Sequence, residues 1–134
     1  MAGFTETEHG GRLRVAIANA IVGLWKDHYG RGPAGARTFI EDQFVFVVLQ
    51  DGLTRNEQTL LDAGREDVVR RFRVSFQETI APLAAQVMEQ VTGQRVVAHR
   101  CQIVFNPTMT FEIFVMDGPV GGRGRPLPSA DPDL

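Results

Sequence analysis

The sequence predicts an α+β domain in which two β-hairpins are separated by helices. A long amphipathic segment precedes the first pair of strand-like runs, a second helical region follows it, and another pair of strand-like runs comes last. The order α-β-β-α-α-β-β favours a four-stranded sheet, antiparallel or mixed, packed against a long kinked helix. We expect the first helix to lie on the sheet or at a dimer interface.

The first helix is predicted to begin at a capping box and to end at a glycine. Thr5 and Glu8 have the spacing in which each side chain bonds the backbone N–H of the other. Gly30 ends the helix, and Gly32-Pro33 prevents it from resuming. Two adjacent apolar stripes indicate that the helix buries two faces. They are Leu13, Ile17, Ala20 and Leu24, and Val15, Ala18, Val22, Trp25 and Tyr29.

Residues 36–41 and 44–50 are rich in β-branched and aromatic side chains, which predicts two strands joined by a tight turn at Asp42-Gln43. Pairing Glu41 with Phe44 divides their side chains between two faces. The core face carries Thr38, Ile40, Val45, Val47 and Leu49. The opposite face is aromatic and apolar with two charges, and carries Arg37, Phe39, Glu41, Phe44, Phe46 and Val48.

Two helices are predicted between the hairpins. Thr54 and Glu57 form a second capping box, which starts a short helix that runs to about Ala63. The longer helix after Gly64 has an apolar stripe at spacings of three and four, made of Val69, Phe72, Phe76, Ile80, Leu83, Val87 and Val91. Pro82 is expected to kink this helix, or to restart it with Thr79 as a local cap. Gly93 ends it.

The second hairpin is predicted over residues 94–105 and 109–116, with a three-residue loop that pairs Phe105 with Met109. This register places the odd-numbered residues on a strongly apolar face, made of Val97, His99, Cys101, Ile103, Phe105, Met109, Phe111, Ile113 and Val115. The even-numbered residues, which include Phe114 and Met116, then lie on the opposite face.

The outer face of the sheet follows from the two registers. It would carry Phe39, Phe44, Phe46, Val48, Val104, Phe114 and Met116. Apolar patches of more than a few hundred Å² are rare on soluble monomers. Either the first helix covers this face, in a three-layer sandwich, or another subunit does. We therefore expect a homodimer, formed through this face or through that helix.

The composition divides the chain into one folded domain, residues 1–117, and a tail, residues 118–134. The tail holds four Gly and four Pro, so it is predicted to be disordered. The net charge of −2 argues against a nucleic-acid partner. No apolar run reaches the ~18 residues of a spanning helix, so direct membrane insertion is not expected. A single cysteine and an acidic start favour a cytoplasmic location.

No catalytic residue, metal site or cofactor is predicted, and we expect the protein not to be an enzyme. The three histidines, His9, His28 and His99, lack a metal-ligand spacing. His99 and Cys101 share a strand face, but no carboxylate is expected there to complete a site. A structural histidine beside a core cysteine is therefore favoured.

The Gly30-Arg31-Gly32-Pro33 turn, with Arg37 on the next strand, is the candidate ligand-binding site. Glycines permit close backbone approach, and two guanidinium groups can grip a carboxylate, bicarbonate or phosphate. The alternative is a helix C-cap and a turn, with Arg37 paired to Glu41.

A third hypothesis comes from the element order, since α-β-β-α-α-β is that of a type II KH RNA-binding domain. KH domains clamp the nucleic-acid backbone with a GXXG loop between adjacent helices. Here that junction, residues 63–67, reads AGRED, with one glycine and two acids. RNA binding is therefore disfavoured.

Several segments, spread over about residues 8–117, resemble the bacterial MpsC family. They are WKDHYGRGPAGAR at residues 25–37, FVFVVLQ at 44–50, LTRNEQTLLDAGREDVVRRFR at 53–73, Pro82, and VTGQRVV at 91–97. The family is named for a sodium-translocating, membrane-potential-generating system that is associated with cation and bicarbonate uptake. The resemblance implies a non-enzymatic accessory or regulatory protein that acts by protein contacts, with a membrane-protein complex as a partner. A small-anion sensor (bicarbonate, phosphate or nucleotide) is the alternative, and a degenerate KH-like module comes last.

Overall fold

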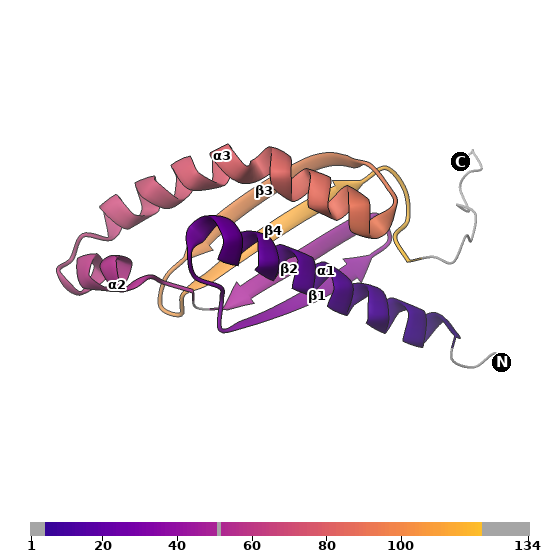
Figure 1. Cartoon of the computed structure of the whole chain (residues 1–134), viewed down its shortest axis with the longest axis horizontal. Coiled ribbons are helices and arrows are strands. Elements are labelled where there is room, and N and C mark those ends of the chain that lie inside the picture. The colour runs from indigo at the N-terminus through magenta and orange to yellow at the C-terminus, as the bar shows by residue number, and fades with distance from the viewer. Residues whose placement is uncertain (1–4, 51, 122–134) are drawn as a thin grey trace.

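Both hairpins join in one four-stranded antiparallel sheet of order β1-β2-β4-β3 (Figure 1). The computed structural model describes residues 5–50 and 52–121, with side chains from residue 10 onward. The predicted α+β class and element order are confirmed. The elements are α1 (Thr5–Tyr29), β1 (Gly35–Glu41), β2 (Phe44–Gln50), α2 (Arg55–Asp62), α3 (Glu66–Thr92), β3 (Val96–Val104) and β4 (Met109–Met116).

Residues adjacent in sequence determine where the helices end or begin. Gly30 has φ +85° directly after α1, and Gly93 has φ +74° directly after α3, a conformation that suits glycine because it has no Cβ. At α2 the predicted capping box is confirmed. Glu57 N donates to Thr54 Oγ1 at 3.2 Å, and Thr54 N donates to Glu57 Oε1 at 2.9 Å. The predicted Thr5–Glu8 box lies outside the described side chains.

Both long helices lie on the same side of the sheet (Figure 1). Helix α1 packs against α3 and against strands β1 and β2, while α3 packs against β3. The two buried stripes of α1 are therefore explained by contacts with a helix and with the sheet. The three-layer alternative is wrong for this chain, because α1 does not cross to the other face. The core between the layers contains Ile17, Ile21, Leu24, Trp25, Val45, Val47, Leu49, Ile80, Ala84, Met88, Phe114 and Met116.

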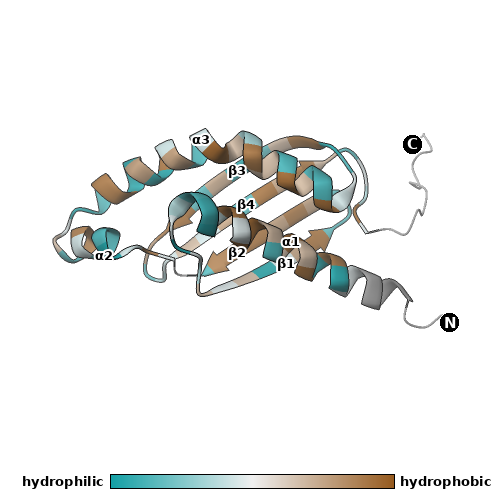
Figure 2. Cartoon of the chain, in the orientation of Figure 1, coloured by the Kyte–Doolittle hydropathy of each residue, from teal (hydrophilic) through white to brown (hydrophobic). Residues whose placement is uncertain are grey.

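The first hairpin has the predicted register. Glu41 pairs with Phe44 and Phe39 with Phe46, around a turn in which Asp42 has φ +59°. Val45, Val47 and Leu49 are buried against the helices, as expected. Strand β2 is apolar along most of its length in Figure 2, because both of its faces carry apolar side chains.

The second hairpin differs from the prediction by one residue. Val104, not Phe105, pairs with Met109, so a four-residue connection replaces the expected three-residue loop. A one-residue slip moves every side chain of a strand to the other face. Phe114 and Met116 are consequently 0% exposed in the core rather than on the outer face, while Phe111, Ile113 and Val115 take the outer positions. A register shift between Val96 and Ala98 leaves Val97 56% exposed instead of buried.

The buried stripe of α3 is also rotated from the predicted one. Phe72 and Leu83 are 55% and 38% exposed, while the buried positions are Val69, Arg73, Gln77, Ile80, Ala84 and Met88. The helix runs without interruption through Pro82, and Thr79 Oγ1 donates to the Ser75 carbonyl at 2.9 Å, so Thr79 is not a cap. Hydrophobicity alone missed this face because it includes the two polar residues Arg73 and Gln77.

The folded part extends beyond Asp117. Val120 is 6% exposed and packs into the core, and its N–H donates to the Asp42 carbonyl at 2.9 Å. This hydrogen bond joins the segment after β4 to the turn between β1 and β2. The rest of the predicted tail, residues 122–134, lies outside the described residues.

Candidate functional site

The Gly30–Pro33 turn has a structural explanation. The positive φ of Gly30 ends α1, and a Cβ at Gly32 would lie 2.5 Å from Lys26 Cγ. Arg31 is exposed at the turn. Arg37 lies on the outer face of the sheet, with its Cζ 5.0 Å from the Phe39 ring centroid. The hollow that Arg37 lines does not include Arg31, so the two guanidinium groups do not share it. An anion site at this turn stays a prediction.

The outer face of the sheet is a continuous apolar surface. We call this surface the outer patch, and define it as Phe39, Phe44, Phe46, Val48, Phe111, Ile113 and Val115. Phe39, Phe44 and Phe46 are 45%, 42% and 47% exposed, and Ile113 is 36% exposed. Of the residues expected at a dimer interface, Phe39, Phe44, Phe46 and Val48 belong to this patch, whereas Phe114 and Met116 are buried in the core on the other side of the sheet. No described segment covers it.

Charged residues border the outer patch. On β1, Arg37 and Glu41 lie two residues either side of Phe39, and both are exposed. On β3, Arg100 lies opposite Ile113 and is exposed as well. An open hollow of about 810 Å³ extends over Phe39, Phe44 and Phe46 and reaches Arg14 of α1. The surface therefore has an apolar centre and a charged margin, which is the usual anatomy of a protein–protein interface.

A buried ion pair joins α2 to α3. Arg73 is 1% exposed, and its Nε and Nη2 donate to the two carboxylate oxygens of Glu57 at 2.7 and 2.9 Å. Its Nη2 also donates to the Gly52 carbonyl at 3.2 Å. The guanidinium carbon lies 4.3 Å from the Tyr29 ring centroid and 5.3 Å from that of Trp25. Both carboxylate oxygens of Glu57 thus accept a hydrogen bond from the Arg73 guanidinium, as the burial of a charge requires.

A second buried carboxylate lies on the inner face of the sheet. Glu112 is 2% exposed; its Oε2 accepts from Trp25 Nε1 at 2.8 Å, and its Oε1 lies 2.7 Å from His99 Nε2. The His99 ring stacks on Phe114 with centroids 4.3 Å apart. The expectation that no carboxylate accompanies His99 and Cys101 is wrong, because it relied on the slipped register. Desolvation by burial, and then the charge of Glu112, raise the pKa of the Cys101 thiol far above its ordinary value.

Sequence reasoning missed Arg73, Glu57 and Glu112 as members of buried networks. A usable signal was present for Arg73 and Glu112. Arg73 stands between Phe72 and Phe76, and Glu112 interrupts an otherwise apolar strand. A charged residue inside such a run indicates either an exposed face or a buried partner, and only packing distinguishes the two. Within the described residues no three His, Cys, Asp or Glu side chains gather as metal ligands would.

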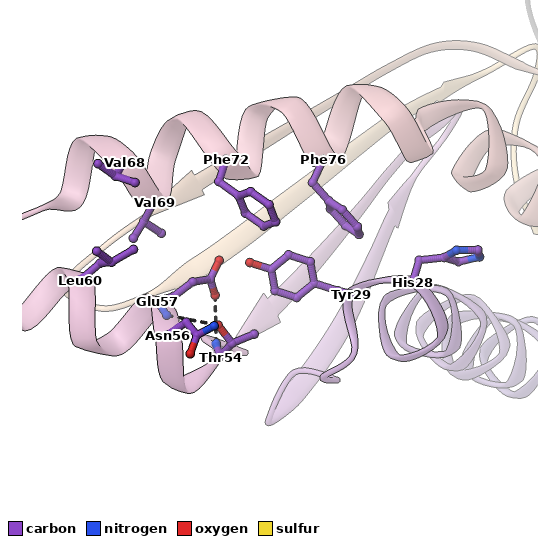
Figure 3. A pocket seen from close by; sticks show the side chains of 10 residues that line it. All are labelled: His28, Tyr29, Thr54, Asn56, Glu57, Leu60, Val68, Val69, Phe72 and Phe76. Carbon is purple, nitrogen blue, oxygen red and sulfur yellow. Dashed lines mark hydrogen bonds between the residues drawn. The ribbon is translucent and has the colours of Figure 1, made fainter.

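A cavity of about 400 Å³ lies where the end of α1 meets α2 and the first half of α3 (Figure 3). The residues that line it are His28, Tyr29, Thr54, Asn56, Glu57, Leu60, Val68, Val69, Phe72 and Phe76. Tyr29 packs edge-on to Phe76 with centroids 4.7 Å apart. Its hydroxyl is buried and has no hydrogen-bond partner among the described residues. The sequence contained no motif for this cavity, because its walls come from three separate helices.

The α2–α3 junction, where a KH domain would bind nucleic acid, carries paired charges. Arg70 Nη2 lies 2.6 Å from Glu66 Oε2, and Arg71 Nη1 lies 3.3 Å from Asp67 Oδ2. These arginines are therefore matched by acids one helical turn away. The geometry lends the RNA-binding hypothesis no support.

The described part of the chain is thus a two-layer α+β domain, with two long helices on one face of an antiparallel sheet and an exposed apolar surface on the other. A family model described as "Na+-translocating membrane potential-generating system (MpsC)" matches residues 9–118, and the chain belongs to this family. Searches of curated proteins and of solved structures gave no match. Across the residues that the structure describes, no helix is both long and apolar enough to span a bilayer.

Proposed function

We propose that this chain is a non-catalytic accessory or regulatory component of a membrane-potential-generating system, acting in the cytoplasm by protein–protein contacts. Its MpsC family membership supports the link to such a system. The observation that carries the contact mechanism is the outer patch. Three of its phenylalanines are more than 40% exposed on a rigid sheet, and aromatic side chains in such positions contribute strongly to binding when a partner covers them.

The occupant of the outer patch that its charges favour is a second copy of the chain. Phe39, Phe46 and Ile113 form a row across the sheet, and Arg37 and Glu41 lie on opposite sides of this row. A two-fold axis along the row, in the plane between two stacked sheets, places each Arg37 opposite the Glu41 of the other copy. The apolar centre of one copy then packs against the apolar centre of the other. Such self-complementarity is what an isologous interface requires.

Charge reversal tests this pairing. Arg37→Glu and Glu41→Arg, each alone, bring like charges together and should weaken self-association about tenfold or more. The double variant Arg37→Glu/Glu41→Arg restores opposite charges and should recover the wild-type dissociation constant. Sedimentation equilibrium measures all four proteins, and Arg55→Glu, an exposed reversal on α2, is the matched control.

Two results would contradict the homodimer. One is a wild-type protein that stays monomeric at a concentration of about 100 μM, above the range of most specific assemblies. The other is a double variant that associates no better than the single ones.

The link to membrane energetics needs a cellular test. In a host that lacks the gene, the wild-type chain should restore the membrane potential, followed with a potential-sensitive dye. Phe46→Asp places a charge in the centre of the outer patch and should fail to restore it, while Arg55→Glu should succeed. Equal complementation by Phe46→Asp, at equal protein level, would remove the outer patch from the mechanism.

A further inference from the structure

The cavity between α1, α2 and α3 is separate from the outer patch, since its walls belong to the helical layer on the other side of the sheet (Figures 1 and 3). We propose that this cavity is a binding site for an uncharged, ring-bearing small molecule with one hydrogen-bonding group. The proposal does not depend on the proposed function. It rests on the size, the walls, the polar group and the charge balance of the cavity.

The walls favour a ring. Tyr29, Phe72 and Phe76 present three aromatic side chains along one side, and Leu60, Val68 and Val69 present aliphatic ones. Phe72 is 55% exposed although it follows the helical spacing of core residues. Tyr29 packs against Phe76 and Phe72 with ring centroids 4.7 and 6.0 Å apart, and the exposed part of the Phe72 ring is left for a further ring, which would pack edge-on or offset against it. A volume of about 400 Å³ is at the lower end of the range of small-molecule sites, which suits a small ligand.

The Tyr29 hydroxyl is the polar group. Its oxygen is buried without a partner in the described part of the chain, and Figure 3 shows it pointing toward Glu57. A buried polar group without a partner is costly, and a ligand that hydrogen-bonds to it would remove this cost. The ring of Tyr29 is held in place by the Arg73 guanidinium, 4.3 Å from its centroid. The hydroxyl is thus positioned before any ligand arrives.

The charge balance favours an uncharged ligand. Glu57 is the one carboxylate in the lining, and Arg73 and the Thr54 N–H already occupy its oxygens. The lining contains neither lysine nor arginine. His28 is its one further titratable side chain besides Tyr29, and it is exposed. An ionised ligand would therefore lose hydration without gaining a counter-charge.

Three matched probes test the proposal on the intact protein. Naphthalene carries the ring alone, 2-naphthol adds one hydroxyl, and 2-naphthoate adds a charge. We expect saturable binding in the order 2-naphthol, naphthalene, 2-naphthoate, followed by protein-observed NMR. Shifts should map to the residues that line the cavity, and 2-naphthol should raise the unfolding temperature.

Two variants identify the site. Tyr29→Phe keeps the ring and removes the hydroxyl, so it should weaken 2-naphthol about fivefold and leave naphthalene unchanged. Phe72→Ala removes an exposed wall and should weaken both neutral probes about tenfold. Val74→Ala is the control, because Val74 is a similarly exposed residue of α3 outside the lining.

The proposal is overturned if neither neutral probe binds saturably up to its solubility limit. It is also overturned if Tyr29→Phe and Phe72→Ala bind both probes like the wild type. Tighter binding of 2-naphthoate than of 2-naphthol would refute the uncharged class.

Discussion

Each face of the sheet holds some residues of the kind usually found on the other: the inner face buries a few polar side chains within the hydrophobic core, and the outer face exposes aromatic ones. The inner face buries Thr38, Thr110 and Glu112 at 8%, 2% and 2% exposure, while the outer face leaves Phe39 and Phe46 almost half exposed. On the inner side, the buried carboxylate has found partners in Trp25 and His99. On the outer side, the aromatic rings have no cover among the described residues. A buried polar group is stable when its hydrogen bonds are made, whereas an exposed apolar patch stays in contact with water unless a partner covers it.

This difference separates residues that hold the fold together from residues that are free to serve contacts. Removal of an inner residue leaves a cavity or an unpaired polar atom, and both lower the free energy of unfolding. Removal of an outer residue changes mainly the surface that a partner would see. The predictions below use matched pairs of residues from the two faces.

The largest difference is expected between two phenylalanines. Phe114→Ala should lower the free energy of unfolding by about 3–5 kcal/mol, because Phe114 is fully buried and its loss leaves a cavity. Phe46→Ala should lower it by less than about 1 kcal/mol, since Phe46 is half exposed. Urea unfolding at low protein concentration, where self-association does not contribute, measures both. Equal losses would mean that the two faces are not distinct in the monomer.

A smaller effect is expected at Glu112. Glu112→Ala should cost about 2–3 kcal/mol, because the Trp25 N–H and the His99 ring nitrogen lose their partner inside the core. Glu41→Ala, an exposed carboxylate on the outer face, should change stability by less than about 0.5 kcal/mol. A shift in Trp25 fluorescence should accompany only the first substitution. If Glu112→Ala unfolds like the wild type, Glu112 is not a structural carboxylate.

The smallest effect concerns the Cys101 thiol. Because burial and Glu112 raise its pKa, the native thiol should react with iodoacetamide at pH 8.5 far more slowly than the denatured one. The raised pKa in the folded state also means that the unfolded chain releases this proton first as the pH rises. The free energy of unfolding should therefore decrease as the pH rises above about 8.5, the ordinary pKa of a cysteine. This decrease should be less steep in Cys101→Ala. Equal alkylation rates in the native and denatured protein would contradict this burial.

Much of the local structure could be predicted from residue patterns. Gly30 and Gly93 end helices, the Thr54–Glu57 capping box starts α2, and the Asp42-Gln43 turn sets the register of the first hairpin. Each of these signals involves residues that are neighbours in sequence. The candidate cavity could not be predicted in this way, because Tyr29, Glu57 and Phe72 come from three helices that meet only in the folded chain.

The register of the second hairpin is the instructive failure. In β4 the odd-numbered residues are the more apolar set, so periodicity alone turns them inward. The fold turns the even-numbered set inward, which includes Glu112. The cost of burying this carboxylate is offset by hydrogen bonds from α1 and β3, and hydrophobic periodicity carries no information about such distant partners.

The sequence by itself therefore determined the α+β class, the order of seven elements, most of their ends and one hairpin register, because caps, turns and periodicity act over a few residues. Tertiary structure decided which face of β4 points inward, that Arg73 and Glu112 are buried, and that α1 lies beside α3 and leaves the outer patch bare. Those outcomes depend on the free energy of whole layers packed together, in which a distant partner can make a charged side chain stable in the core.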